Sequence, residues 1–144
     1  MALAFQVTFD AHDPEALGKF WGALLGYVEQ PPPEGHDSWE SFLSANGVPE
    51  QEWQDGYAVV DPDGNGPRIY LQKVPEGKTV KNRMHLDVDV GGGRSVPLEE
   101  RQRRVDEGVT RAVGLGATRT KSFEEGGGYF VVMADPEGNE FCLH

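Results

Sequence analysis

Cysteine is almost absent from this sequence, because Cys142 is the only one among 144 residues. A single cysteine cannot form an intramolecular disulfide, and it cannot supply a cluster of thiolates for a metal. Disulfides mark oxidising compartments and are rare in the cytosol. We therefore expect a cytoplasmic protein.

Basic residues are scarce relative to acidic ones. The chain has 13 Lys and Arg against 24 Asp and Glu, which gives a formal net charge of -11. Binding to nucleic acid relies on clustered basic side chains that displace counterions from phosphates. The charge therefore argues against nucleic acid as a partner, and it also disfavours acidic membrane surfaces.

Long apolar runs are missing as well. No uncharged segment reaches the roughly 18 residues that a membrane-spanning helix needs. The opening residues, MALAFQVTFD, lack the basic stretch and apolar run of a secretory signal. We expect a protein without a membrane anchor.

Glycine, in contrast, is abundant, with 19 residues in the chain. A chain of 144 residues fits one domain of ordinary size that can bury a hydrophobic core. So many glycines favour short elements joined by frequent turns over a few long helices.

The chain opens with a strand followed by a helix. Apolar and polar residues alternate over residues 3–10, which predicts a strand with one apolar face. Asp13 and Pro14 then provide an N-cap and a first-turn proline, and apolar residues recur at helical spacing until Gly26. We expect this helix to cover the apolar face of the sheet.

A similar order of elements returns in the second half. A polar connector over residues 75–82 separates the halves, and a strand at 84–90 and a helix at about 97–113 follow it. The remaining strands are expected at residues 38–44, 57–60 and 68–74 in the first half, and at 129–134 and 140–144 in the second.

An internal repeat is the strongest signal in the sequence. DPDGN at 61–65 returns as DPEGN at 135–139, each time after a strand that contains a Val-Val pair. Asp-Pro opens a turn and Gly-Asn tolerates positive φ, so either pentad alone would fit any hairpin. Two pentads after two strand-helix openings indicate a duplicated module.

Three segments carry a resemblance to a known family: FDAHDPEALGKFWGALLGY, NRMHLDVDV and VVMADPEGNEFCLH. They resemble the vicinal oxygen chelate superfamily, and within it the small proteins of the glyoxalase and bleomycin-resistance type. The resemblance covers nearly the whole chain. It implies one α+β domain over 1–144, built from two βαβββ modules at 1–75 and 82–144. Their curved mixed sheet encloses a cavity, and the helices lie outside.

The resemblance also implies a metal site in the cavity, with ligands from the first and last strands of each module. Because Met84 and Leu86 are expected to face the helix layer, His85 points the other way, at the position where relatives carry a histidine ligand. Gln6 holds the equivalent place in the first module. Its alternative role is that of a polar residue lining a wet cavity.

The last strands depart from the metal-binding pattern of the family. By spacing from DPEGN, the carboxylate of relatives falls on Cys142, whose thiolate suits zinc better than hard cations. The corresponding residue of the first module is Tyr70 or Gln72, and neither is charged. His85, Gln6 and Gln72 are therefore the expected metal ligands, for Zn, Ni, Mn or Fe, but a dedicated high-affinity site is less expected than a pocket without metal.

Two carboxylates share the expected cavity face with these residues. Asp87 and Glu140 are the candidates for a general base that removes a proton next to a substrate carbonyl. The substrate-binding candidates are Trp39, Trp53, Tyr70 and Cys142. Trp39 and Trp53 fall in the irregular stretch 29–56, where aromatic side chains can roof an apolar pocket, although ordinary core filling is the alternative.

Two functions fit this sequence. The first is a glyoxalase-like protein that binds a small aromatic or cationic compound without a metal, since the acidic chain attracts cations. The second is a metal-dependent lyase or isomerase that acts on a small oxygenated metabolite. The resemblance further implies a homodimer, because relatives often pair.

Overall fold

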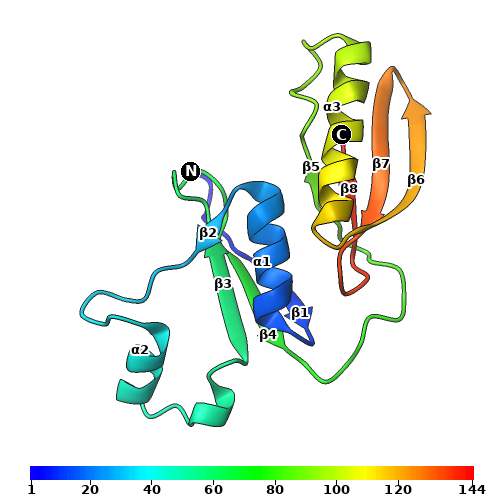
Figure 1. Ribbon diagram of the computed structural model, residues 1–144. Coiled ribbons are helices and arrows are strands. Elements are labelled where there is room, and N and C mark those ends of the chain that lie inside the picture. Colours follow the sequence, from blue (N-terminus) through cyan, green and yellow to red (C-terminus); the bar gives the residue numbers. More distant parts are fainter. The chain divides into compact units, whose positions relative to one another are not determined.

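The computed structural model describes residues 1–144, and the chain divides into two units, Met1–Gly77 and Lys78–His144. Each unit holds one four-stranded mixed sheet with a helix packed against it (Figure 1). The α+β class and the βαβββ order predicted from the sequence are confirmed in both units. None of the helices is both long and apolar enough to cross a membrane.

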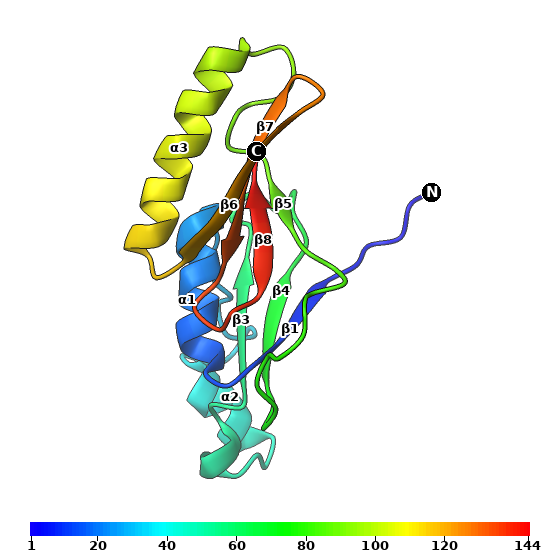
Figure 2. The same cartoon turned by 90° about the vertical axis from the view of Figure 1, so that its right-hand side faces the viewer.

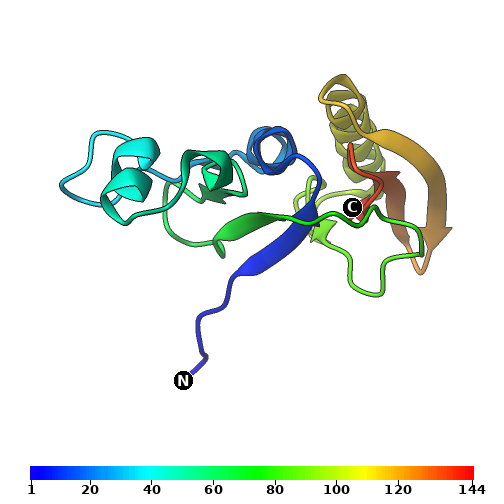
Figure 3. The ribbon, with the colours of Figure 1, turned by 90° about the horizontal axis from the view of Figure 1, so that it is seen from below.

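The first unit has a sheet in the order β1-β4-β3-β2, in which β1 and β4 are parallel and the other neighbours are antiparallel. Its elements are β1 (Val7–Ala11), α1 (Pro14–Leu25), β2 (Val28–Glu29), α2 (Trp39–Ala45), a 3-10 turn (Glu50–Glu52), β3 (Gly56–Val60) and β4 (Ile69–Lys73). Helix α2 and the 3-10 turn lie side by side near the start of β3 (Figure 3).

Helix α1 begins and ends where the sequence predicts. The Asp13 side chain accepts a hydrogen bond from the Ala16 N–H at 3.1 Å, and Pro14 occupies the first turn. Gly26 ends the helix with φ at 75°, in the left-handed region that favours glycine. These local signals suffice because cap and turn preferences act within a few residues of the chain.

The core of the first unit lies between α1 and the sheet. Its most buried side chains are Leu17, Trp21, Val59, Ile69 and Leu71. Since side chains alternate along a strand, the burial of Ile69 and Leu71 under α1 places Tyr70 and Gln72 of β4 on the opposite face. That open face is where polar residues are available for binding.

One strand prediction in the first unit is wrong, and another places the start of its strand too early. Residues 38–44 form most of helix α2, which begins at an N-cap where the Ser38 hydroxyl accepts a hydrogen bond from the Ser41 N–H at 3.1 Å. The predicted strand over 3–10 begins only at Val7, and Leu3 and Phe5 are 90% and 72% exposed. Alternation of apolar residues makes a strand only where a neighbouring strand supplies hydrogen bonds, and β4 begins opposite Val7.

The second unit repeats the arrangement with the order β5-β8-β7-β6. Its elements are β5 (Asp87–Val88), α3 (Leu98–Gly114), β6 (Thr118–Glu125), β7 (Gly128–Ala134) and β8 (Glu140–Leu143). Helix α3 runs along one face of this sheet (Figure 2). The buried residues Val105, Met133, Phe141 and Leu143 form its core.

Strand β6 is absent from the prediction. Its sequence TRTKSFEE is exposed at every position except Phe123, which is half-buried, so it lacks the alternation that marks a strand with one buried face. It is an edge strand that pairs with β7 alone. Charged side chains on such an edge discourage pairing with other molecules.

The two repeated pentads form the same kind of turn in both units. Asp61 accepts hydrogen bonds from the N–H groups of Asp63 and Asn65 at 2.9 and 3.0 Å, and Asp135 accepts them from Glu137 and Asn139 at 2.9 and 3.0 Å. Each turn precedes the last strand of its unit. The internal repeat in the sequence is therefore also a repeat in the structure.

Candidate functional site

A cavity of about 610 Å³ lies within the first unit. It is lined by residues of α1, α2, the 3-10 turn, β3 and β4, together with Glu29 and Arg68. Its volume falls within the range of ligand pockets in proteins, roughly 300–1,000 Å³. The three aromatic residues expected to bind substrate, Trp39, Trp53 and Tyr70, all line it.

The indole rings of Trp39 and Trp53 are fixed by the backbone. The Trp39 Nε1–H donates to the Gln30 carbonyl at 2.7 Å, and the Trp53 Nε1–H donates to the Val48 carbonyl at 2.9 Å. Both side chains are half-buried. Because the ring nitrogens are already satisfied, the apolar ring faces are what these residues offer to the cavity.

Tyr70 and Tyr57 complete the aromatic lining. Tyr70 fits because residue 56 is glycine, since a Cβ there would lie 2.4 Å from the Tyr70 hydroxyl oxygen. Burial raises the pKa of Tyr57 to about 12, and the negative charge of Glu29 and a hydrogen bond with it add to the shift. Tyr57 therefore stays neutral at physiological pH and does not act as a base.

Charge in the lining is strongly one-sided. Six carboxylates line the cavity: Glu15, Glu29, Glu40, Glu50, Glu52 and Asp55. Arg68 is the only basic residue in the lining. A concave surface with this balance concentrates cations from solution.

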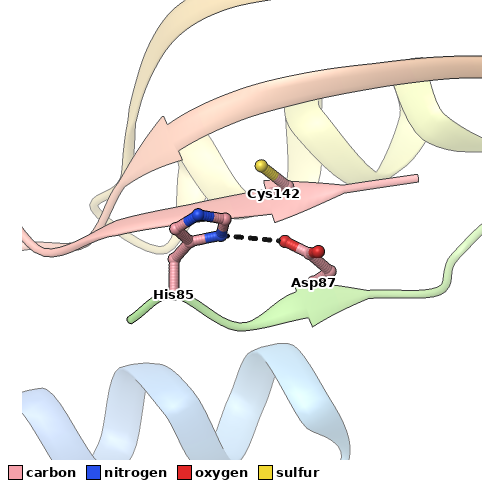
Figure 4. A group of neighbouring side chains, drawn as sticks. All are labelled: His85, Asp87 and Cys142. Atoms are coloured by element: carbon pink, nitrogen blue, oxygen red, sulfur yellow. Dashed lines mark hydrogen bonds and ion pairs between the residues drawn. The ribbon is translucent and has the colours of Figure 1, made fainter. Parts of the chain in front are cut away.

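A second group of functional side chains lies in the second unit. His85, Asp87 and Cys142 each present one ligand atom, and these atoms lie within 4.8 Å of one another. The His85 Nδ1 and an Asp87 carboxylate oxygen are 3.2 Å apart (Figure 4). The sequence assigned His85 to a metal site, Asp87 to proton transfer and Cys142 to substrate, whereas the structure brings all three together.

Strand register explains how this group forms. Asp87 of β5 is the direct partner of Cys142 in the parallel neighbour β8, and the Cys142 N–H donates to the Leu86 carbonyl at 2.9 Å. His85 lies two residues before Asp87, in the segment that leads into β5, and its ring meets the Asp87 carboxylate. The expected orientation of His85 away from Leu86 is consistent with this register, although Met84 is 85% exposed and packs against no helix.

The Cys142 thiol is held in its neutral form. Burial raises its pKa to about 11, and the charge of Asp87 with a hydrogen bond to it adds to the effect. A thiol with so high a pKa is a poor nucleophile at neutral pH. Nucleophilic catalysis by Cys142 is thus not supported by its environment.

Glu140 is engaged in other contacts. Its carboxylate accepts a hydrogen bond from the Asn82 N–H at 3.0 Å and forms an ion pair with Lys78 at 3.0 Å. The Asn82 N–H and the Lys78 ammonium lower the Glu140 pKa to about 2. Such a carboxylate is a weak base, so the environment of Glu140 argues against the predicted role in proton abstraction.

Gln6 and Gln72 do not come together in the first unit. The Gln6 carboxamide oxygen accepts a hydrogen bond from the Arg68 guanidinium at 3.0 Å, whereas Gln72 lies next to Asp10 in the parallel register of β1 and β4. Four residues of strand separate the two levels, which is roughly 13 Å. The two glutamines therefore lie at different levels of the sheet, and their role as metal ligands stays a prediction.

Sequence reasoning missed several residues of the cavity. Glu50 and Glu52 belong to the 3-10 turn and Arg68 to the segment before β4, so no motif links them in the chain. The density of acidic residues between 50 and 55 was the one signal that pointed to them. Only the fold places Arg68 in the same cavity.

Comparison with known proteins gives one family and a set of similar structures. The family model of the glyoxalase-like domain matches residues 6–144. A glyoxalase/bleomycin resistance protein/dioxygenase family enzyme from Burkholderia phytofirmans PsJN is similar with a TM-score of 0.60 at 18% identity, over 96% of this chain and 94% of that one. No curated protein matches the sequence.

Two fosfomycin resistance proteins are also similar in structure. FosX from Mesorhizobium loti has a TM-score of 0.61 at 12% identity, over 100% of this chain and 92% of that one. A point mutant of FosX from Listeria monocytogenes, in a complex with Mn(II) and 1S,2S-dihydroxypropylphosphonic acid, has a TM-score of 0.62 at 14% identity, over 100% of this chain and 90% of that one. Identities this low establish a common fold and nothing finer.

Proposed function

Since the chain belongs to the glyoxalase-like domain family, we propose that it binds a small organic cation with an apolar or aromatic part, in the cavity of its first unit. One observation carries the proposal. Four aromatic rings and six carboxylates line the same cavity of about 610 Å³, against a single guanidinium.

Two physical effects favour a cation there. Cations are attracted to the faces of aromatic rings, by about 0.5–2 kcal/mol for each contact depending on exposure to water. The carboxylates add a negative field whose reach is limited by salt to about 8 Å at physiological ionic strength. Neither effect requires a metal ion.

A matched pair of small compounds tests the proposal. Phenethylamine and 2-phenylethanol share a ring and a two-carbon chain, but only the first is charged at neutral pH. We expect phenethylamine to bind at least tenfold more tightly in calorimetry, with an affinity that falls as salt rises. Equal binding of the two compounds, or no binding of phenethylamine, would contradict the proposal.

Variants locate the binding. Trp53→Ala should weaken phenethylamine binding by about tenfold, the size of one cation–π contact, whereas Trp53→Phe should retain most of it. Glu52→Gln should weaken the same compound and leave 2-phenylethanol unchanged. The control is Glu99→Gln, an exposed carboxylate of α3 outside the cavity, which should change neither affinity.

We propose a divalent metal site at His85, Asp87 and Cys142 as the second candidate function. The donors are one imidazole nitrogen, one carboxylate oxygen and one sulfur. Three protein ligands with an open position are typical of catalytic zinc, and a thiolate favours zinc over manganese. The donor set therefore fits zinc, although the Listeria monocytogenes FosX complex contains Mn(II).

A bound metal would supply Lewis-acid polarisation of a substrate oxygen. If Asp87 binds the metal, Glu140 is the remaining carboxylate candidate for proton abstraction, and its pKa of about 2 makes it a weak base. This shortage of a base is the reason why binding ranks ahead of lyase or isomerase activity. Gln6 and Gln72, in the first unit, also stay proposals as metal ligands.

Zinc titration of chelator-treated protein separates the two candidates. If the site exists, zinc should bind at one equivalent and manganese more weakly, and His85→Ala or Cys142→Ser should lower zinc affinity by at least tenfold. Cobalt(II) should give thiolate charge-transfer absorption that Cys142→Ser removes. His36→Ala, in the first unit, is the matched control. Zinc uptake that survives both site variants would place the metal elsewhere.

The homodimer and the cytoplasmic location also remain proposals. Each sheet has two edge strands, β1 and β2 in one and β5 and β6 in the other, and a second copy could pair with an edge strand, least readily with β6 because its charged side chains discourage pairing. Sedimentation equilibrium decides between a dimer and a monomer.

A further inference from the structure

We infer that the ligand of the first-unit cavity is a zwitterion, in which an ammonium group is accompanied by a carboxylate or similar anionic group that binds Arg68. The inference rests on the proposed function and names its ligand class more narrowly. It starts from an anomaly, namely the single guanidinium in a lining that holds six carboxylates.

Neutral groups alone hold this guanidinium in place. The Arg68 Nε–H donates to the Gln30 side-chain oxygen at 2.8 Å, and Nη1–H donates to the Gln6 side-chain oxygen at 3.0 Å. The guanidinium carbon lies 5.1 Å from the centre of the Tyr70 ring. None of the ion pairs in the structure includes Arg68, so no carboxylate of the protein neutralises it.

The neighbours of Arg68 also fix its direction. Two amide oxygens and one ring face restrict the planar guanidinium, which leaves little rotamer entropy to lose when an anion binds. Gln30 further links this group to the aromatic lining, because its backbone carbonyl accepts the Trp39 indole N–H. Arg68 and Trp39 are therefore held by the same residue.

A pocket that selects simple cations would bind them more tightly if Arg68 were absent. A guanidinium repels an ammonium group nearby, and the half-buried Arg68 bonds to amide oxygens, which are weaker acceptors than a carboxylate. A ligand that carries both charges uses the whole lining, with its ammonium group at the carboxylates and its anionic group at Arg68. Arginine binds carboxylates through two parallel N–H donors, and Nη2 has no protein acceptor in this structure.

Three probes with the same phenyl group test the inference: phenethylamine, phenylalanine and 3-phenylpropanoate. They carry a cation alone, both charges and an anion alone. We expect phenylalanine to bind the native protein at least fivefold more tightly than phenethylamine, and 3-phenylpropanoate to bind most weakly. Calorimetry and tryptophan fluorescence give the affinities.

Substitution of Arg68 should reverse the order of the first two probes. Arg68→Gln removes both the attraction for the carboxylate and the repulsion of the ammonium group, so phenylalanine should bind at least tenfold more weakly and phenethylamine more tightly. Arg68→Lys keeps the charge and should preserve part of the preference, which also guards against a misfolded glutamine variant. Arg94→Gln, an exposed arginine of the second unit, should change nothing.

The outcomes separate the two proposals. If phenethylamine binds the native protein more tightly than phenylalanine does, or if both Arg68 variants leave the ratio unchanged, the zwitterion is wrong while the cation pocket stands. If neither amine binds, both proposals fail.

Discussion

Asp135→Ala should lower the free energy of unfolding by about 2–4 kcal/mol. Asp135 is the one buried charged residue of the core and is only 3% exposed. Its carboxylate accepts the Glu137 and Asn139 N–H groups, and the Asn139 side-chain amide at 2.9 Å. Alanine would leave these donors without an acceptor in a region that water reaches poorly. Urea unfolding followed by circular dichroism measures the loss.

The internal repeat supplies the control for this prediction. Asp61 holds the equivalent turn through the N–H groups of Asp63, Asn65 and Gly66, at 2.8 to 3.0 Å. Hydrogen bonds from Asp63 and Gly66 lower its pKa, but the turn is more exposed and water can replace the lost acceptor. Asp61→Ala should therefore lower the free energy of unfolding clearly less than Asp135→Ala does. Equal losses in the two variants would mean that the geometry of the turn, and not the burial of the carboxylate, determines the free energy lost.

Local signals predicted most of the fold. The cap at Asp13, the proline at 14 and the glycine at 26 define α1 within a few residues, and the two pentads define two turns. These elements could be predicted because the groups that stabilise them are close in sequence. The order of the modules then followed from their repetition.

The errors occurred where stability comes from distant partners. Residues 38–44 have aromatic and polar residues that fit a strand, yet they form α2 because the Ser38 cap satisfies the first turn and no neighbouring strand is present. The reverse holds for β6, whose polar sequence gives no strand signal until β7 supplies its hydrogen bonds. The stability that a strand gains from pairing depends on both segments, so it cannot be predicted from the sequence of one segment alone.

The candidate sites also divide into residues that local sequence could predict and residues whose role depends on distant parts of the chain. Alternation along a strand predicted that His85, Asp87 and Cys142 share a face, because side-chain direction in a strand has a fixed period of two. The aromatic residues Trp39 and Trp53 were singled out by their type and by their place in the irregular stretch 29–56. Arg68 could not be found, because its role depends on the cavity residues that the fold gathers near it. The roles of all these residues in binding or catalysis stay predictions.

Trp21→Ala should destabilise the protein most, by about 3–5 kcal/mol. Trp21 is 1% exposed, stacks on Phe9 with ring centres 5.1 Å apart and meets Phe20 edge to face at 5.4 Å. Alanine would leave a large cavity between α1 and its sheet. Denaturant unfolding followed by circular dichroism measures the effect, and a loss below about 1 kcal/mol would contradict the packing described for this core.

The matched variant Trp21→Phe retains an aromatic ring and should cost roughly 1–2 kcal/mol. It also sharpens the binding experiments, because the chain contains three tryptophans and the other two, Trp39 and Trp53, line the cavity. In that background all tryptophan emission comes from the proposed site. A cationic or zwitterionic ligand that enters the cavity should therefore change a larger fraction of the fluorescence than in the native protein.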